Sequence, residues 1–335
     1  MKALRYLLYF AIPVGVAFVT FQILYRTFFV PFDPNGTPHY VQISDDLDFE
    51  GICKKLVEAK IIRNTRSLCL YARWKGDLKP IRPGEYELSA AMKPEQILEA
   101  LESGKVHKRF IMIEPGQSVW TIGEVVEKVG LNTRKEFDHA LTDPKLLAAA
   151  GISSSSFEGY LAPGEYALTR PISARDIVWA MLERAEKNWT EEYSAKADEL
   201  RMSRHEVLTL ASIIEKTTKV PSEKKLVSSV LHNRLNHGMK LQSDETVIYG
   251  LQDFSGTLSE EDRASPSPYN TYMNYGLPPG PITNPTEESI RAALFPDDTS
   301  YLFFARDQFG DLVFSETLKE HNAVVGNSKM QNEGP

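Results

Sequence analysis

The sequence has little of the side-chain chemistry that binds metal ions. Only two of its 335 residues are cysteine and seven are histidine, and no H-E-x-x-H motif occurs. His232 and His237 are five positions apart and share no helical face, and neither cysteine has the spacing of a zinc ligand. We therefore predict no metal site and no other cofactor.

Positive charge is also scarce. Lys and Arg total 38 against 45 Asp and Glu, and the net charge of -7 gives no overall attraction to a phosphate backbone. Nucleic acid is therefore excluded as a predicted partner. The 42% hydrophobic and 10% aromatic content is typical of a folded chain, and this length normally divides into two or more domains.

Long apolar runs are confined to the N-terminus. Tyr6–Tyr25 carries no charge, and a helix of that length spans about 30 Å of hydrocarbon. Lys2 and Arg5 precede it without an acidic residue, which predicts a cytoplasmic N-terminus and export of everything after Arg26. A cleaved signal peptide is the alternative, but the run is long for one and no A-x-A site follows. We predict a single-pass anchor.

The two cysteines leave an open question. An exported location permits a disulfide between Cys53 and Cys69. Both lie in apolar helical patterns, so two buried free thiols are at least as well supported.

A small α+β module is predicted after a Pro- and Gly-rich linker at 31–38. Its expected elements are strands at Tyr40–Ile43 and Gly84–Leu88 and helices at Phe49–Ala59, Thr65–Trp74 and Pro94–Leu101. The strand-helix-helix-strand order resembles a LysM domain, although many small domains share that order.

The next segment repeats this plan. At an offset of 70, six apolar residues of the first module fall on apolar residues of the second: Val41, Ile43, Phe49, Ile52, Leu56 and Ile61 on Ile111, Ile113, Val119, Ile122, Val126 and Leu131. Residues 83–86, Pro-Gly-Glu-Tyr, recur at 163–166 with an offset of 80. We predict two related modules with a loop inserted in the second. The alternative is two unrelated units of similar plan.

A helix carrying a glutamate is predicted next. Residues 203–206, Ser-Arg-His-Glu, have the S-x-x-E form of a capping box. Leu208, Ala211, Ser212 and Glu215 follow at helical spacing, so Glu215 continues a mostly apolar face. With few hydrogen bonds there, its pKa would be raised and it would hold a proton near neutrality, as a glycosidic general acid needs. The alternative is a solvated residue near a helix end.

The chain from Leu208 onward resembles the endolytic murein transglycosylase family (MltG or YceG-like). LASIIEK is followed in family order by LQSDETV, SPYNTY, GLPPGPITNP and KEHN, and weaker resemblance extends back to Phe49. The resemblance implies a lyase anchored in the bacterial inner membrane, with its catalytic part on the outer side. Such a lyase cuts peptidoglycan glycan strands between N-acetylmuramoyl and N-acetylglucosamine units, leaves a 1,6-anhydro end and acts in cell-wall assembly. Peptidoglycan synthases become candidate partners.

The resemblance also assigns roles to residues. Glu215 falls on the first Glu of the family's S-I-I-E-K-E motif and is implied as the catalytic acid/base, while Thr217 replaces the second Glu. Glu245 stands where L-Q-S-D-P-T-V has Pro. The implied substrate-binding residues are Glu158, Gln242, Ser243, Asp244, Tyr269, Asn270, Thr271 and Tyr272. The alternatives are a turn with buried tyrosines for 269–272 and a structural role for Glu158.

The resulting prediction is an α+β protein in five parts: an anchor with its flanks at 1–30, the linker at 31–38, a LysM-like module at 39–106, a second module at 107–200 and a catalytic domain at 201–335. A single carboxyl suffices for the lyase reaction, and we expect Glu215→Gln to abolish cleavage with little change in stability. One alternative is a hydrolase with Asp244 or Glu245 as second carboxylate. The other is a non-catalytic, glycan-binding membrane scaffold.

Overall fold

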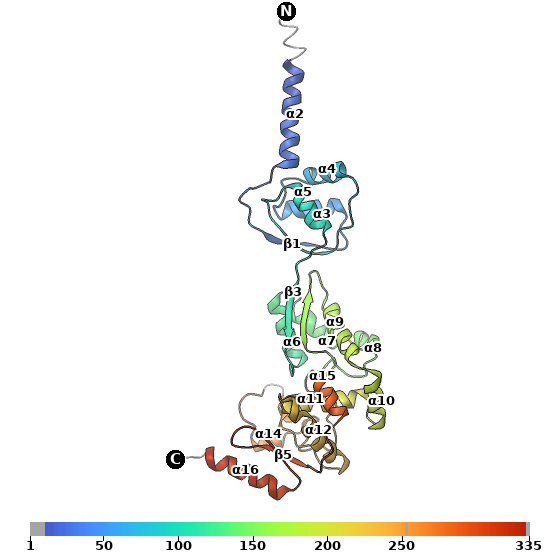
Figure 1. Cartoon of the computed structure of the whole chain (residues 1–335), viewed down its shortest axis with the longest axis vertical. Coiled ribbons are helices and arrows are strands. Elements are labelled where there is room, and N and C mark those ends of the chain that lie inside the picture. The colour runs from blue at the N-terminus through green and yellow to red at the C-terminus, as the bar shows by residue number, and fades with distance from the viewer. Residues whose placement is uncertain (1–10, 252–253, 333–335) are drawn as a thin grey trace, which may run out of the picture. The chain divides into compact units, whose positions relative to one another are not determined.

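The structure of the protein, a computed structural model, describes residues 11–251 and 254–332 (Figure 1). Within them the fold is α+β, with helices around three two-stranded sheets, β1–β2, β3–β4 and β5–β6. The chain forms two compact units. One contains the residues up to Phe110 together with Ala167–Ile172, and the other contains Ile111–Tyr166 and the residues from Ser173 onward.

The N-terminal helix α2 spans Ile12–Phe29. No helix among the described residues is both long and apolar enough to cross a membrane. The predicted anchor at Tyr6–Tyr25 lies partly outside the described residues. At its end α2 packs on the first module, where the rings of Phe28 and Tyr71 lie 6.2 Å apart. Its other apolar side chains, such as Phe18, are exposed.

The first module has the predicted elements. They are β1 (His39–Ile43), α3 (Phe49–Glu58), α4 (Thr65–Lys75), β2 (Gly84–Leu88) and α5 (Pro94–Glu102). The two strands pair antiparallel with Val41 opposite Tyr86. Their inward side chains pack with Leu56, Leu68 and Leu101 into one apolar core. The strand-helix-helix-strand order is thus confirmed, and the closer likeness to LysM stays a prediction.

Residues 31–38 are packed against this module although they form no helix or strand. The backbone N–H of Asp33 donates to the carbonyl of Ala90 at 2.9 Å, and the Ser89 hydroxyl donates to the carbonyl of Gly36 at 2.6 Å. A Cβ on Gly36 would lie 2.7 Å from that of Ala90. Glycine therefore allows this close approach.

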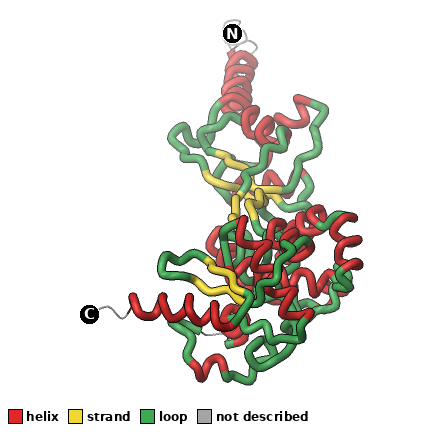
Figure 2. Tube along the Cα trace, turned by 60° about the horizontal axis from the view of Figure 1, so that its bottom comes forward, coloured by secondary structure: helices red, strands yellow, loops and turns green. Residues whose placement is uncertain are grey.

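The second module repeats the order of the first and adds one helix. Its elements are β3 (Arg109–Ile113), α6 (Val119–Val129), α7 (Arg134–Leu141), α8 (Pro144–Ala149), β4 (Gly164–Leu168) and α9 (Ala174–Asn188). Figure 2 shows the short strands of both modules in yellow among red helices. Helix α8 has no counterpart in the first module, and it accounts for the change of offset from 70 to 80.

Matched details favour duplication over two unrelated units. Of the six apolar pairs aligned by sequence, every member except the half-buried Phe49 is buried. The hydroxyl of Tyr86 donates to the carbonyl four residues earlier at 2.7 Å, and that of Tyr166 does the same at 2.5 Å. Gly84 and Gly164 both have positive φ, at 155° and 131°. The same special backbone position thus opens the second strand of each copy.

The C-terminal part is mainly helical. It contains α10 (Glu191–Glu199), α11 (Arg204–Thr217), α12 (Pro221–Asn236), α13 (Asp244–Gly250), α14 (Glu260–Arg263), α15 (Glu287–Leu294), β5 (Phe303–Arg306), β6 (Leu312–Ser315) and α16 (Leu318–Asn332). Helix α11 lies at the centre and contacts α10, α12, α13 and α15. The antiparallel β5–β6 hairpin lies beside α16 (Figures 1 and 2).

The second module and the C-terminal part pack together within one unit. The Tyr160 hydroxyl lies 2.7 Å from Nδ1 of His205, whose Nε2 lies 2.8 Å from the carbonyl of Pro279. Since a carbonyl only accepts, Nε2 carries the proton and Nδ1 accepts from the tyrosine. Gly159 has φ of 84°, and a Cβ there would lie 2.3 Å from Pro281. The division into five parts stays a prediction.

Candidate active site

Helix α11 places Glu215 in the interior. It begins with the predicted capping box, in which the amide of Ser203 donates to Glu206 Oε2 at 2.8 Å and the Ser203 hydroxyl accepts from the amide of Glu206 at 3.3 Å. Nine consecutive residues, Val207–Glu215, are buried, so the helix contacts protein on all sides. Only 5% of Glu215 is exposed. The alternative of a solvated residue near a helix end was therefore wrong.

Donors from two other helices converge on the Glu215 carboxyl. Its Oε2 accepts from the Ser289 hydroxyl at 2.7 Å, from the Thr286 hydroxyl at 2.5 Å and from the Thr286 amide at 2.9 Å. Lys224 Nζ, on α12, lies 3.3 Å from Oε2 and 3.4 Å from Oε1. Every donor to Oε2 apart from the lysine therefore comes from the start of α15.

The start of α15 is suited to an anion. Thr286 is its N-cap, and its hydroxyl accepts from the Ser289 amide at 3.4 Å. The unpaired N–H groups and dipole of a helix N-terminus favour negative charge within the first turn. Buried Lys224 adds a positive charge beside Glu215 and also donates to the Thr286 hydroxyl at 3.1 Å.

These contacts decide the protonation state of Glu215. Burial acts to raise its pKa, but the hydrogen bonds from Ser289 and Thr286, aided by Lys224, outweigh burial and the pKa is lowered. The prediction of a carboxyl that holds its proton near neutrality was therefore wrong. The helix's own pattern shows an apolar face, and it contains no sign of donors that arrive from α12 and α15.

Glu158 lies in a second buried position. The amide of Val119 donates to its two carboxyl oxygens at 3.2 and 3.3 Å, Asn284 Nδ2 donates at 3.3 Å and the Tyr249 hydroxyl donates at 3.3 Å. Burial raises the pKa of Glu158 to about 8, although the donors Val119 and Tyr249, the amide of Gly159 and the charge of Lys216 act to lower it. The 3% exposure of the residue favours the structural alternative over substrate contact.

The two C-terminal motifs form one network. The Gln242 amide donates to the carbonyl of Thr271 at 3.2 Å, and the Ser243 amide donates to its hydroxyl at 2.9 Å. Asn270 is buried, and its amide group donates to the carbonyls of Arg263 and Ser265 at 3.0 and 2.8 Å. The residues 242–244 and 269–272 are thus brought together, and the buried members support a turn.

Asp244 is tied down within this network. Arg263 binds both of its carboxyl oxygens at 3.1 and 3.0 Å, and the Tyr272 hydroxyl donates to Oδ1 at 2.6 Å. Burial acts to raise the pKa of Asp244, but the bonds from Arg263 and Tyr272 prevail and the pKa is lowered. Neighbouring Glu245 has no comparable hydrogen bonds among the described residues, and burial raises its pKa although the charges of Lys216 and Arg306 act to lower it.

Exposure separates the implied substrate-binding residues. Gln242 is exposed, and Asp244, Tyr269 and Tyr272 are half-buried. The buried members are Glu158, Ser243, Asn270 and Thr271. The accessible set therefore consists of one amide, one carboxylate and two aromatic rings, side chains that suit hydrogen bonding and stacking on sugars.

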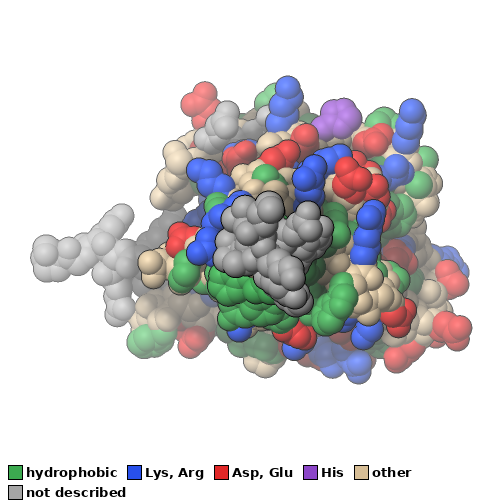
Figure 3. All heavy atoms as spheres, turned by 90° about the horizontal axis from the view of Figure 1, so that it is seen from above, with side chains coloured by type: hydrophobic (Ala, Val, Ile, Leu, Met, Phe, Trp, Pro, Cys, Tyr) green, Lys and Arg blue, Asp and Glu red, His purple; other side chains and the backbone are tan. Residues whose placement is uncertain are grey.

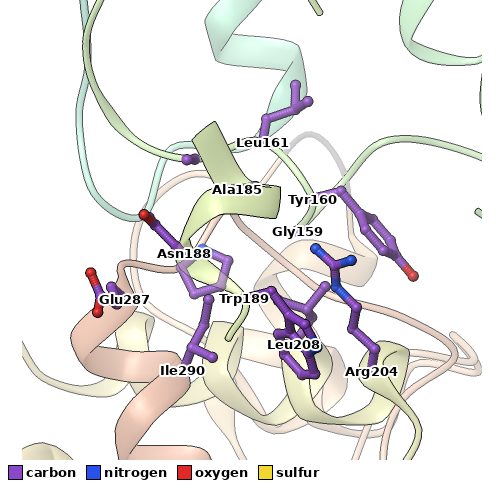
Figure 4. Close-up of a pocket in the computed structure, with 12 residues that line it drawn as sticks. Gly159, Tyr160, Leu161, Ala185, Asn188, Trp189, Arg204, Leu208, Glu287 and Ile290 are labelled. Carbon is purple, nitrogen blue, oxygen red and sulfur yellow. The ribbon is translucent and has the colours of Figure 1, made fainter. Parts of the chain in front are cut away.

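A small cavity lies beside the other end of α11 (Figure 4). Tyr160, Trp189 and Leu208 line it, and the Arg204 guanidinium lies 4.9 Å from the Trp189 ring centre. Its volume is about 20 Å³, enough for one water molecule, whereas ligand pockets hold roughly 300–1,000 Å³. This cavity is therefore no glycan site.

Sequence reasoning did not find the partners of Glu215. Lys224 stands nine residues later with no motif to mark it. Thr286 and Ser289 have the T-x-x-S spacing of a helix cap, and that signal was present just beyond the quoted ITNP segment. This spacing predicts that a helix begins at Thr286, but it does not predict that the beginning of the helix contacts Glu215.

The fold and the site define a class, namely α+β proteins whose central helix carries one buried carboxyl held by hydrogen-bond donors. A sequence profile of the YceG-like family matches residues 41–327. The chain belongs to the YceG-like family.

Several relatives have names or solved structures. An endolytic murein transglycosylase of Bacillus subtilis is 31% identical over 301 residues, which cover 84% of this chain and 82% of that protein. One of Streptococcus pneumoniae is 26% identical, covering 90% of this chain and 61% of that protein. The crystal structure of a yceG-like protein from Listeria monocytogenes has a TM-score of 0.60 at 31% identity and covers 86% of this chain and 99% of that chain.

Proposed function

We propose that this protein is an endolytic peptidoglycan lytic transglycosylase with Glu215 as its acid/base. It cleaves the bond between N-acetylmuramoyl and N-acetylglucosamine units and leaves a 1,6-anhydro end. The observation that carries the proposal is the buried Glu215 carboxyl with its converging donors, in a chain whose relatives are named endolytic murein transglycosylases.

The two carboxyl oxygens of Glu215 differ in how many hydrogen bonds they accept. Oε2 accepts from Thr286 and Ser289, whereas Oε1 has one hydrogen-bond partner among the described residues, Lys224 at 3.4 Å. Oε1 is therefore the oxygen that exchanges a proton with the glycan. A sugar ring that covers Oε1 removes water from it, and this added burial raises the pKa and lets the carboxyl take up a proton.

The reaction then needs no second carboxyl. Glu215 gives its proton to O4 of the leaving N-acetylglucosamine as the C1–O4 bond breaks. The resulting carboxylate removes the proton of the muramoyl 6-hydroxyl as O6 bonds to C1 of its own ring. The attack is intramolecular, so it gains from proximity, and no water is consumed.

Product analysis tests this proposal. Mass spectrometry of purified peptidoglycan after digestion should show anhydro-ended fragments from within strands, and Glu215→Gln should form none. Products with reducing ends would support the hydrolase alternative. Asp244, whose two oxygens are bound by Arg263 and Tyr272, is poorly placed to activate water for that route. A wild-type protein that binds strands without cutting them would support the scaffold alternative.

The proposal includes a location of the protein in the bacterial inner membrane. The uncharged Tyr6–Tyr25, the basic Lys2 and Arg5 and the exposed apolar side chains of α2 support a single-pass anchor in a bacterial inner membrane. The rest of the chain then lies on the outer side, where glycan strands and peptidoglycan synthases are accessible. Figure 3 shows basic and acidic side chains interspersed on the face seen from above.

Protease treatment of spheroplasts tests this topology. A protease added outside should digest the part after Arg26, and full protection of that part would contradict the anchor.

A further inference from the structure

Asn284 joins the second module to the C-terminal part of the same compact unit. It is fully buried, and its Oδ1 accepts from the amides of Gly159 and Leu161 at 3.0 and 3.1 Å. Its Nδ2 donates to the carbonyl of Gln117 at 3.1 Å and to Glu158 at 3.3 Å. Every hydrogen-bonding atom of this side chain therefore contacts the second module.

The backbone of Asn284 pairs with the same module. Its amide donates to the carbonyl of Gln117 at 3.1 Å, and its carbonyl accepts from the amide of Gly116 at 3.3 Å. Gly116 and Gln117 belong to the turn between β3 and α6. A Cβ on Gly116 would lie 3.9 Å from Cγ of Glu215, so this turn packs against the Glu215 side chain.

Glu158 completes the connection from the other side. It accepts from Asn284 and also from the amide of Val119, the first residue of α6. It therefore fixes Asn284 relative to the turn that ends at α6. Two residues after Asn284 comes Thr286, whose amide and hydroxyl both donate to Glu215.

We propose that Asn284 and Glu158 are positioning residues through which the second module holds Thr286 against the catalytic carboxyl. This inference rests on the proposed role of Glu215. The second module is then a part of the active site as well as a spacer. Both side chains are buried, Asn284 fully and Glu158 to all but 3%, so they act through Thr286 and the turn at Gly116 and not by contact with the glycan.

Other charged and titratable groups face these two carboxyls. Lys216, Tyr249 and Tyr269 act electrostatically on Glu158 or bind it. Lys224 faces Glu215 and also lies 3.8 Å from the exposed Glu288. None of these groups is changed in the variants below, so their influence is the same in every comparison.

The test reads the pKa of Glu215 directly in the full-length protein. Glutamate labelled with ¹³C at the side-chain carboxyl gives a signal that titrates, and its absence in Glu215→Gln assigns it. Asn284→Ala and Glu158→Leu should each raise the pKa of Glu215 by about one unit, a tenfold change in proton affinity, because the Thr286 donors move away. The double variant should shift less than the sum.

Two variants serve as controls. Glu158→Gln keeps an oxygen for Val119 and Asn284, and it should leave the pKa of Glu215 within about 0.3 unit of wild type. Asn233→Ala removes a comparable amide, which donates to the carbonyls of Thr299 and Tyr301 at 2.8 and 2.9 Å. It should lower stability without shifting the pKa of Glu215.

Kinetics on glycan strands give a second readout. Asn284→Ala should lower kcat at least tenfold with KM within twofold, since its side chain lies behind the site. Should it fail to fold, Asn284→Asp is titrated in its place, since it keeps both Oδ1 contacts and loses the Nδ2 donor to Glu158 and to the carbonyl of Gln117. An unshifted Glu215 in folded Asn284 and Glu158→Leu variants overturns the proposal. Absence of anhydro products from wild type would instead refute the proposed function, and the titration would remain readable.

Discussion

Removal of the Ser289 hydroxyl measures how strongly the site favours an ionised Glu215. Ser289 is fully buried and donates to Oε2 at 2.7 Å. Ser289→Ala deletes this one donor and adds no bulk. Thr286 and Lys224 stay in place, so Glu215 keeps its remaining partners.

The expected size follows from the charge on the acceptor. A hydrogen bond to a charged group contributes about 1.5–3 kcal/mol, which corresponds to a pKa rise of about 1–2 units for Glu215. Because the folded-state pKa lies below the usual 4.5, the bond adds stability above that pH and loses it as pH falls through the folded-state pKa. Ser289→Ala should therefore lower the free energy of unfolding by about 1.5–3 kcal/mol at pH 7 and by less at pH 3.

Urea unfolding of wild type and variant at both pH values checks this expectation. Ser228→Ala is the matched control, because Ser228 is also fully buried but its hydroxyl has no partner among the described residues. It should cost less than about 0.5 kcal/mol at either pH. An equal loss at pH 7 and pH 3 for Ser289→Ala, or an equal loss for both serines, would refute the reasoning.

Three further predictions concern other parts of the chain. Glu215→Gln should lower the cleavage rate on the order of 100-fold to 10,000-fold and, contrary to the sequence expectation, lower the melting temperature, because Lys224 loses its carboxylate partner; an unchanged melting temperature would contradict the buried pair. Binding of a β-1,4-linked N-acetylglucosamine oligomer should take up protons near neutral pH, seen as a binding enthalpy that depends on buffer ionisation, and buffer-independent heats would exclude the pKa rise proposed for Glu215. Cys53 and Cys69 are free, and their Sγ atoms lie 3.1 Å apart. The oxidant diamide should therefore form a disulfide between them within one chain, seen by mass spectrometry as the loss of two hydrogens. Two thiols that still react with an alkylating reagent after denaturation would contradict this short distance.

The sequence predicted the elements of the modules well because local periodicity determines them. Strand Gly84–Leu88 and the cap at Ser203 were located from pattern alone. Glu215 was found from its helix and from the family motif. Its low pKa could not be predicted, since the donors Thr286 and Ser289 follow 71 and 74 residues later and reach it only through tertiary packing.

Burial of polar motif residues was likewise outside the reach of pattern reasoning. Asn270 and Thr271 stand between tyrosines in a segment that suits sugar contact, yet both are buried and bind neighbouring backbone. The same amide and hydroxyl chemistry serves a turn and a ligand equally well. Only the three-dimensional surroundings distinguish the two uses.

The turn between the first strand and the first helix has the same backbone hydrogen bond in both modules but different surroundings. In the first copy the Leu47 amide donates to the carbonyl of Ser44, and in the second Gln117 donates in the same way to Glu114. At the offset of 70, Asp46 corresponds to Gly116, which borders Glu215. An aspartate there would bring a negative charge close to Glu215, the proposed acid/base, and to its neighbour Lys216. The two turns are therefore not interchangeable, because the turn of the second module packs against the side chain of Glu215, the proposed acid/base, and a substitution at Gly116 would act on that residue as well as on folding.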